Sequence, residues 1–166
     1  LGRYHTNIYS KSQNVELIGV YDASPKAAEA IANEFQTKAF STIRELAEQC
    51  DAVSVAVPAT LHYPVAMELI GLKKHILMEK PIASEVQEAV EMEAAEKENL
   101  VFAVGHVERF NPAMDFLEEN KSGPLFIEAH RLAKYPPPRP GLHRRGTEVS
   151  VVLDLMIHDL DLILSM

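Results

Sequence analysis

Short apolar runs alternate with amphipathic stretches over the first two thirds of the chain. The runs at 52–57 and 100–104 are continuously apolar, which is typical of strands buried on both faces, and 15–21 is rich in β-forming residues. The stretches at 25–35 and 60–70 instead repeat apolar residues at helical spacing. Repeated strand–helix alternation with short connections predicts right-handed βαβ units, a parallel sheet and therefore an α/β fold.

Local signals mark where several of the predicted helices begin. Ser24 and Pro25 supply an N-cap and a proline in the first turn, and Thr42 with Glu45 forms a capping box. We expect Ser84 with Gln87 to cap a further helix in the same way. The other predicted elements are helices at 2–10 and 111–120 and strands at 38–40 and 75–79.

The pattern changes after residue 120. Residues 124–132 alternate like a half-exposed strand, and 135–146 is rich in proline and arginine. Residues 151–166 are apolar at nearly every position, which predicts a helix that is buried on most sides. We therefore expect one domain at 1–121 and the beginning of a second at 122–166.

Composition excludes several classes of protein. The 166 residues carry a net charge of -8, which disfavours a nucleic-acid partner. No apolar run approaches the roughly 18 residues that a membrane span requires, and the polar N-terminus lacks the apolar core of a signal peptide. Cys50 is the single cysteine. We expect a cytoplasmic protein without membrane partners. Because the chain opens without Met and stops inside an apolar segment, we interpret it as part of a longer protein.

The run 75–81, HILMEKP, places polar side chains directly after a predicted strand. In open α/β sheets, ligands bind outside the carboxyl ends of the strands, so Lys80 is placed for chemistry. A surface lysine at a strand end is the alternative.

Two further loops follow predicted strands. In 57–62, VPATLH, the next helix offers free N–H groups to an anion, although a plain strand–helix turn needs the same residues. The loop 105–112, GHVERFNP, gathers His106, Glu108, Arg109 and Asn111 at the mouth of the sheet. A semi-buried histidine and an ion pair of Arg109 with an acid are the structural alternatives there.

Gly2 and Asp22 are spaced like parts of a dinucleotide-binding motif. Gly2 opens a predicted helix, and Asp22 follows an apolar strand twenty residues later. In that interpretation Gly2 is the last glycine of a motif whose first strand precedes Leu1, and Asp22 binds the ribose hydroxyls. A carboxylate there favours NAD over NADP, because it repels a 2′-phosphate. An N-terminal glycine and a turn aspartate are the alternative.

The helix 151–166 carries a polar stripe. At about 100° per residue, Asp154, His158 and Asp161 fall within roughly 60° of each other, whereas Asp159 lies off that face. An aspartate one turn from a histidine can hold its tautomer and raise its basicity, which suits general acid–base catalysis. A metal site and a structural Asp–His pair remain alternatives.

Four motifs in register resemble the Gfo/Idh/MocA family of oxidoreductases: VPATLH at 57–62, MEKP at 78–81, GHVERFNP at 105–112 and DLMIHDLD at 154–161. The resemblance implies a Rossmann domain, here incomplete at its N-terminus, followed by the start of an α/β domain that often serves oligomerisation. The RFNP and DLMIHD segments resemble the branch that contains UDP-N-acetylglucosamine 3-dehydrogenases. An NAD-dependent oxidation of a hydroxyl carbon in a sugar or nucleotide sugar is therefore implied, by a full-length protein that is a homo-oligomer.

The resemblance also implies residue roles. Lys80, behind a cis bond to Pro81, contacts substrate and nicotinamide ribose, and His158 is the acid–base group with Asp154 beside it. The expected cofactor-binding residues are Gly2, Asp22, Pro58, Thr60, His62, Glu79, Lys80 and Arg109. The expected substrate-binding residues are Lys80, Asn111, Asp154 and His158, and no metal ligand is expected.

Two interpretations of the chain remain beside this one. The first concerns the proline-rich loop that carries Arg139, His143, Arg144 and Arg145. These basic side chains could bind the diphosphate of a nucleotide sugar, and an exposed connector is the alternative. The second is a non-catalytic nucleotide- or sugar-binding or regulatory protein of the same fold, or an inactive fragment.

Overall fold

The computed structural model describes residues 1–95, 99–120, 123, 126–132 and 149–166. The strands are β1 (Gly19–Val20), β2 (Lys38–Ala39), β3 (Ala52–Val55), β4 (His75–Met78) and β5 (Phe102–Val104). The α-helices are α1 (Gly2–Lys11), α2 (Pro25–Phe35), α3 (Ile43–Ala47), α4 (His62–Gly71), α5 (Val86–Ala95), α6 (Pro112–Glu119) and α7 (Ile157–Ser165). Two 3-10 turns, η1 (Ala59–Leu61) and η2 (Val107–Phe110), and a π-helical segment, η3 (Val152–Met156), complete the described elements.

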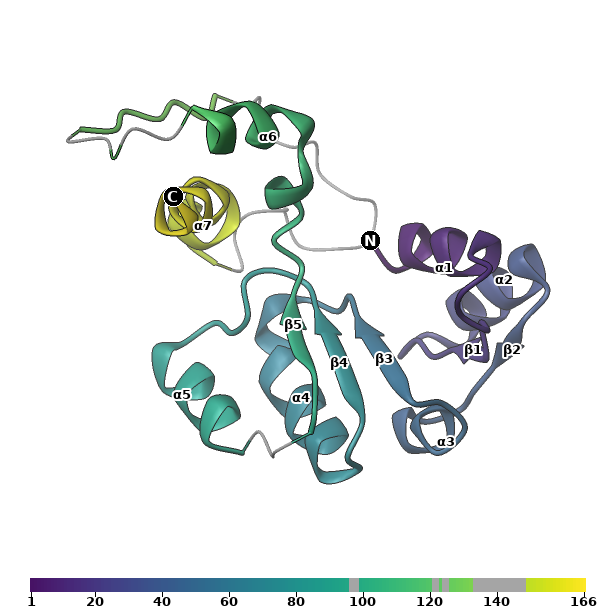
Figure 1. Cartoon of the computed structure of the whole chain (residues 1–166). Helices are drawn as coiled ribbons and strands as arrows, with labels where there is room; N and C mark the ends of the chain where they lie inside the picture. Colours follow the sequence, from purple (N-terminus) through teal and green to yellow (C-terminus); the bar gives the residue numbers. More distant parts are fainter. Residues whose placement is uncertain (96–98, 121–122, 124–125, 133–148) are drawn as a thin grey trace.

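All described strand pairs are parallel, as the alternation of elements predicts. β3, β4 and β5 form a three-stranded sheet with β4 in the centre, and β1 pairs with β2 in a separate two-stranded sheet. Figure 1 shows β3, β4 and β5 side by side, with their arrowheads toward the same end of the molecule. Residues at the carboxyl ends of the strands therefore share one edge.

Alternation along β3 decides which helix covers which face of the sheet. Val53 and Val55 belong to the hydrophobic cluster that α4 and α5 complete, whereas Ser54 between them bonds to His5 of α1. Because successive side chains on a strand point to opposite faces, α1 and α4 lie on opposite sides of the sheet. This arrangement places the start of α1 and the start of α4 on either side of the strand ends.

The core lies between the three-stranded sheet and α4. Leu69 of α4 and Met78 of β4 are completely buried, and each contributes about 1.5–3 kcal/mol through removal of apolar surface from water. The other buried members of the cluster are Ala47, Val55, Ala66, Ile70, Ile76, Ala83 and Met92. This packing fixes α4 against the strand that leads to Lys80.

The predicted helix starts have different outcomes. The Thr42 cap of α3 is confirmed, because Glu45 N–H donates to Thr42 Oγ1 at 3.1 Å, but the Glu45 carboxylate accepts from Ser41 N–H at 3.1 Å and not from Thr42 N–H. The cap by Ser84 and Gln87 is wrong. Glu88 instead accepts the backbone N–H groups of Ser84 and Glu85, while the buried Ser84 Oγ has no hydrogen-bond partner among the described residues.

The prediction that 151–166 is buried on most sides is wrong for the described structure. The helix forms, as η3 and α7, but Val151 is 67% exposed and Leu164 85% exposed. Asp161, held by ion pairs, is its buried residue. Residues 126–132 form no strand, since no described strand lies beside them. The predicted domain boundary at 121/122 and the basic loop at 139–145 lie outside the described residues.

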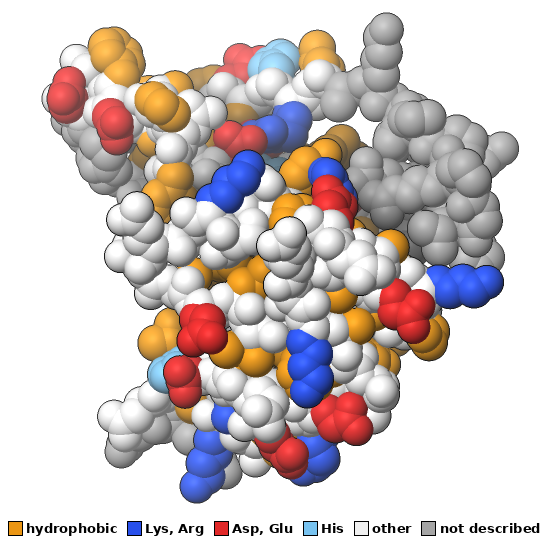
Figure 2. Space-filling model, turned by 90° about the vertical axis from the view of Figure 1, so that its right-hand side faces the viewer, with side chains coloured by type: hydrophobic (Ala, Val, Ile, Leu, Met, Phe, Trp, Pro, Cys, Tyr) orange, Lys and Arg blue, Asp and Glu red, His pale blue; other side chains and the backbone are white. Residues whose placement is uncertain are grey.

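No helix in the described part of the chain combines the length and apolar character needed to cross a membrane. Figure 2 views the molecule from the side of α1 and α2 and shows acidic and basic side chains interspersed there, with hydrophobic ones between them. An ion pair of Arg3 with Glu34 joins these two helices.

Candidate active site

The polar residues that follow the strands gather at the carboxyl edge of the sheets. Gly105 N–H donates to the Met78 carbonyl at 2.7 Å, and the α-carbon of Gly105 faces the Glu79 side chain. Gly2, at the start of α1, lies beside Ala56 at the end of β3. Figure 1 shows α7 to the upper left of the β5 arrowhead, above α5, and the Lys80–Asp154 ion pair links the C-terminal helical segment to the end of β4.

Lys80 connects the end of β4 to the C-terminal helix. Its Nζ donates to Asp154 Oδ1 at 2.9 Å and also to the Asp154 backbone carbonyl. The Lys80 side chain is 16% exposed, which strengthens a charge-assisted bond relative to one in open water. The Lys80–Pro81 peptide bond is cis, as expected.

Glu79 is held from the opposite side by α1. Its Oε1 lies 2.7 Å from His5 Nε2, and His5 Nδ1 lies 2.7 Å from Ser54 Oγ. The hydrogen bond from His5 is the main cause that lowers the pKa of Glu79, with Lys80 contributing through its backbone N–H and its charge. Sequence reasoning missed His5 and Ser54. The available signal was that His5 and Tyr9 share one face of α1.

His158 is surrounded by positive charge and partly buried. Burial is the first cause that lowers its pKa, followed by the charges of Lys80 and Arg131, while Glu108 opposes the shift. Its Nδ1 is shielded from solvent and has no hydrogen-bond partner among the described residues. The imidazole is therefore neutral near pH 7, with a basic nitrogen available.

The expected pairing of Asp154 with His158 does not form. Asp154 directs its carboxylate to Lys80, a residue 74 positions away, because the lysine amine offers it a full opposite charge. Asp154 therefore keeps Lys80 in place, and His158 depends on its own helix for position.

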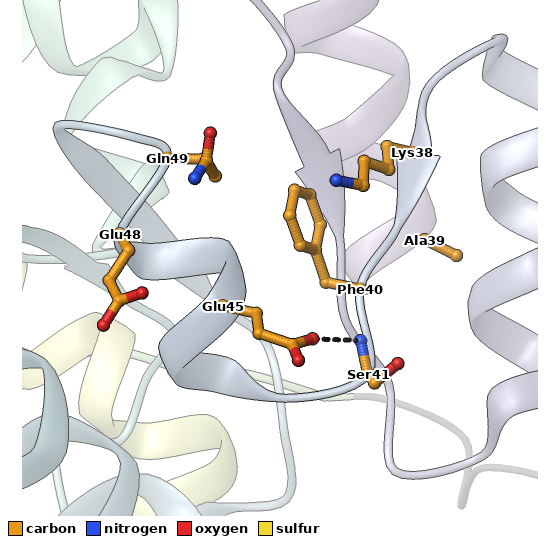
Figure 3. A pocket seen from close by; sticks show the side chains of 7 residues that line it. All are labelled: Lys38, Ala39, Phe40, Ser41, Glu45, Glu48 and Gln49. Carbon is orange, nitrogen blue, oxygen red and sulfur yellow. Dashed lines mark hydrogen bonds between the residues drawn. The ribbon is translucent and has the colours of Figure 1, made fainter.

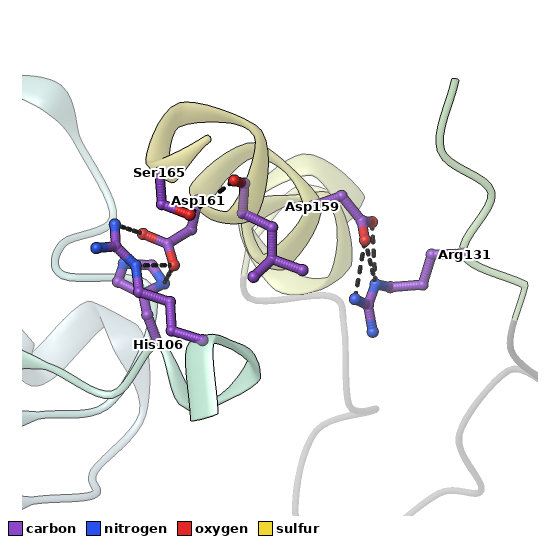
Figure 4. A network of polar contacts seen from close by, with 7 residues as sticks. His106, Arg131, Asp159, Asp161 and Ser165 are labelled. Atoms are coloured by element: carbon purple, nitrogen blue, oxygen red, sulfur yellow. Dashed lines mark hydrogen bonds and ion pairs between the residues drawn. The ribbon is translucent and has the colours of Figure 1, made fainter. Parts of the chain in front are cut away.

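Two arginines hold α7 in one rotational position (Figure 4). Arg109 Nε donates to Asp161 Oδ2 at 2.6 Å, and its Nη2 donates to Asp161 Oδ1. Arg131 forms a similar pair with Asp159, with bonds of 2.8–3.1 Å. These bonds are the first causes that lower the pKa values of Asp161 and Asp159. Arg109 was expected to contact the cofactor. In the structure it forms an ion pair with Asp161, which is the structural alternative given for this residue.

His62 also differs from expectation. Its side chain is 1% exposed, Nδ1 lies 2.7 Å from the Pro81 carbonyl and Nε2 lies 3.1 Å from the Val57 carbonyl. The ring therefore has no polar atom directed at a cofactor. Pro58 and Thr60, which precede it, are exposed.

Asn111 caps the start of α6, where its Oδ1 accepts from Ala113 N–H at 3.1 Å and its Nδ2 donates to Glu108.

In the part of the chain that is described, no three His, Cys, Asp or Glu side chains converge as a metal ion would require. Two hollows, of 320 and 300 Å³, lie away from Lys80 and His158. One follows β2 along α3 (Figure 3), and the other lies on the α1 face of the sheet.

The groups at the other end of the edge fit a dinucleotide. The first turn of α1 has neither a side-chain cap nor an acidic residue, so its N–H groups suit a phosphate. Asp22 is an exposed carboxylate at the end of β1, whose Oδ1 accepts from Ser24 N–H at 2.8 Å. Such a carboxylate suits ribose hydroxyls, and Gly2 leaves room at the helix start.

A parallel sheet with these residues at its carboxyl edge defines the dinucleotide-binding class of α/β proteins. The sequence model of the Gfo/Idh/MocA family, described as an oxidoreductase family with an NAD-binding Rossmann fold, matches residues 1–106. The chain belongs to this family. The α/β fold, the family and its cofactor class are therefore as the motifs predicted.

Relatives agree with this assignment. The chain is 36% identical, over 99% of its length, to UDP-N-acetylglucosamine 3-dehydrogenase of Acidithiobacillus ferrooxidans, and it spans 50% of that protein. A solved structure of that enzyme, GnnA, matches with a TM-score of 0.86 and 37% identity, covering 99% of this chain and 52% of the other. Myo-inositol dehydrogenase from Lactobacillus casei, solved with NAD(H) and myo-inositol, matches with a TM-score of 0.68 and 26% identity, covering 72% of this chain and 37% of the other.

Proposed function

We propose that this chain is the cofactor-binding part of an NAD-dependent dehydrogenase that oxidises a hydroxyl carbon of a sugar or nucleotide sugar. The observation that carries the proposal is that Asp154 holds the Lys80 amine at the carboxyl edge of the sheet, four residues before His158, whose pKa is lowered by burial and by the Lys80 charge. The 36% identity to a UDP-N-acetylglucosamine 3-dehydrogenase makes C3 of UDP-N-acetylglucosamine the first position to test.

The residues divide the chemistry between them. Bound NAD supplies the acceptor for the hydride that leaves the sugar carbon. His158 removes the hydroxyl proton, which its lowered pKa permits at neutral pH. Lys80 donates a hydrogen bond to the same oxygen and stabilises the negative charge that develops there. Asp154 holds the Lys80 amine in position, and in the reverse direction His158 returns the proton.

The remaining binding roles are assigned to residues along the carboxyl edge of the sheets. We assign the pyrophosphate to the start of α1 at Gly2 and the adenosine ribose to Asp22, with Glu79 beside the nicotinamide end. Pro58 and Thr60 are exposed at the neighbouring strand end, where they are available to the cofactor. We place the sugar near Asn111, at the start of α6, and Asp154 of η3.

The domain division and the assembly are parts of the same proposal. We assign residues 1–121 to the cofactor-binding domain and 122–166 to the start of a substrate and oligomerisation domain. The exposed apolar side chains of α7 support an assembly in which that helix is covered.

The test is turnover by the natural full-length protein. Reduction of NAD, followed by absorbance, is measured with UDP-N-acetylglucosamine, UDP-glucose and myo-inositol at equal concentrations. The proposal expects NAD reduction with at least one of them, and a 3-keto product with the first. Saturable NAD binding without reduction by any of the three would favour the non-catalytic binding protein instead. A preference for NADP would contradict the role of Asp22.

A further inference from the structure

His62 is enclosed, and its polar atoms are occupied. It lies in the first turn of α4 with its side chain 1% exposed. Nδ1 lies 2.7 Å from the Pro81 carbonyl, and Nε2 lies 3.1 Å from the Val57 carbonyl. Because both ring nitrogens face backbone carbonyls, we expect His62 to act on the site through the backbone that it holds.

That backbone brackets Lys80 on both sides. Before the lysine, Glu79 N–H donates to the Val55 carbonyl at 3.0 Å, which ties the end of β4 to β3. After it, Pro81 has no N–H to donate, so its carbonyl is the group that anchors the chain. His62 is the hydrogen-bond partner of that carbonyl.

The position of the His62 ring is itself set by the core. Ala66, Leu69 and Ile70 of α4 are buried against the same sheet that contains β4. A close-packed interior of this kind resists small displacements. The core therefore determines, through α4 and the His62 ring, where the Pro81 carbonyl lies.

We propose that His62 is a positioning residue for Lys80, which rests on the proposed function of that lysine in hydroxyl oxidation. We assign the ring N–H to Nδ1, because its contact with a carbonyl is the shorter one. The Nδ1–H bond to Pro81 fixes the direction in which the Lys80 side chain leaves the strand. The contact of Nε2 with Val57 is secondary.

A pair of substitutions in the natural full-length protein separates the two ring nitrogens. The side-chain nitrogen of asparagine takes the place of Nδ1, whereas that of glutamine takes the place of Nε2. His62→Asn keeps the donor to Pro81 and leaves kcat within about threefold. His62→Gln loses that donor and lowers kcat by about 10–100-fold, because a displacement near 1 Å has effects of this size. The Kd for NAD stays unchanged in both.

His75→Gln is the control, because His75 lies at the other end of β4 and accepts from Val101 N–H. It leaves kcat unchanged. Equal kcat values for His62→Asn and His62→Gln, or a weaker Kd for NAD in His62→Gln alone, would overturn the proposal.

A second measurement needs neither a variant nor turnover. Long-range nitrogen–proton NMR of the wild-type protein reports which nitrogen of His62 carries the proton. A protonated Nδ1 supports the proposal, and a proton on Nε2 alone overturns it. If no sugar is oxidised, the dehydrogenase function fails while this result still decides the bond to Pro81.

Discussion

Two histidines, His62 and His158, are linked to Lys80 in different ways, and their surroundings differ in kind. His62, on α4, is completely buried and has a backbone carbonyl within hydrogen-bond distance of each ring nitrogen. His158, on α7, is partly buried, has a shielded Nδ1 without a described partner and has its pKa lowered. The fold supplies the His62 ring with hydrogen-bond partners, whereas Nδ1 of His158 has none among the described residues.

The difference indicates how the site is built. A buried polar atom without a partner is rare in folded proteins, and it costs stability where it occurs. His158 therefore lowers the stability of the fold slightly, and its ring remains available for proton transfer. His62 strengthens the fold and leaves no chemistry of its own. Both are linked to Lys80, because its charge lowers the pKa of His158 and His62 anchors the backbone carbonyl after it.

The largest expected effect is on catalysis by His158→Asn in the full-length protein. Loss of the proton acceptor lowers kcat by about 10²–10⁴-fold. The free energy of unfolding changes by less than about 1 kcal/mol, because no described hydrogen bond of Nδ1 is lost. Steady-state kinetics and urea unfolding measure the two quantities. A kcat close to that of wild type would show that another group accepts the proton.

The opposite result is expected for stability at His62. His62→Leu leaves the Pro81 carbonyl without its N–H donor, at about 1–3 kcal/mol for a buried group. Urea unfolding should therefore show a loss of about 1–3 kcal/mol, larger than that of His158→Asn. A loss below about 0.5 kcal/mol would mean that the ring does not hold this carbonyl in solution.

A smaller effect is expected at the ion pairs that hold α7. Asp161→Asn removes the charge that Arg109 binds, and it lowers kcat by about 3–10-fold by loosening the helix that carries His158. Asp159→Asn, which weakens the Arg131 pair, is the matched control. Asp161 is 9% exposed and Asp159 19%, so the control should change kcat less. The reverse order would assign the positioning of α7 to Arg131.

Much of the fold could be predicted from the sequence because local patterns determined it. The continuous apolar run of β3 and the Thr42 cap of α3 depend on neighbouring residues. Lys80 and His158 could be selected as candidates for the same reason, since each lies at a recognisable strand end or on a helix face. The parallel direction of the strands follows from the helical connections between them.

The pairings within the site could not be predicted, because they join distant residues. His5 and Glu79 are 74 positions apart, as are Lys80 and Asp154. Helical periodicity placed Asp154 beside His158 but could not show that a lysine competes for it. The apolar sequence of α7 indicated that the helix favours burial, but it could not indicate which residues cover it. In the described part of the chain, Leu164 is exposed.

The most direct test is an NMR titration of the His158 ring in the full-length protein, wild type and Lys80→Met. The folded-state pKa is predicted below the ordinary value of 6.5, so protonation destabilises the folded protein as the pH falls through that range. Lys80→Met removes a positive charge and raises the pKa toward 6.5. Lys74→Met, at the far end of β4, leaves it unchanged. A wild-type pKa at or above 6.5, or no change in Lys80→Met, would contradict the effect of burial and of the Lys80 charge on His158.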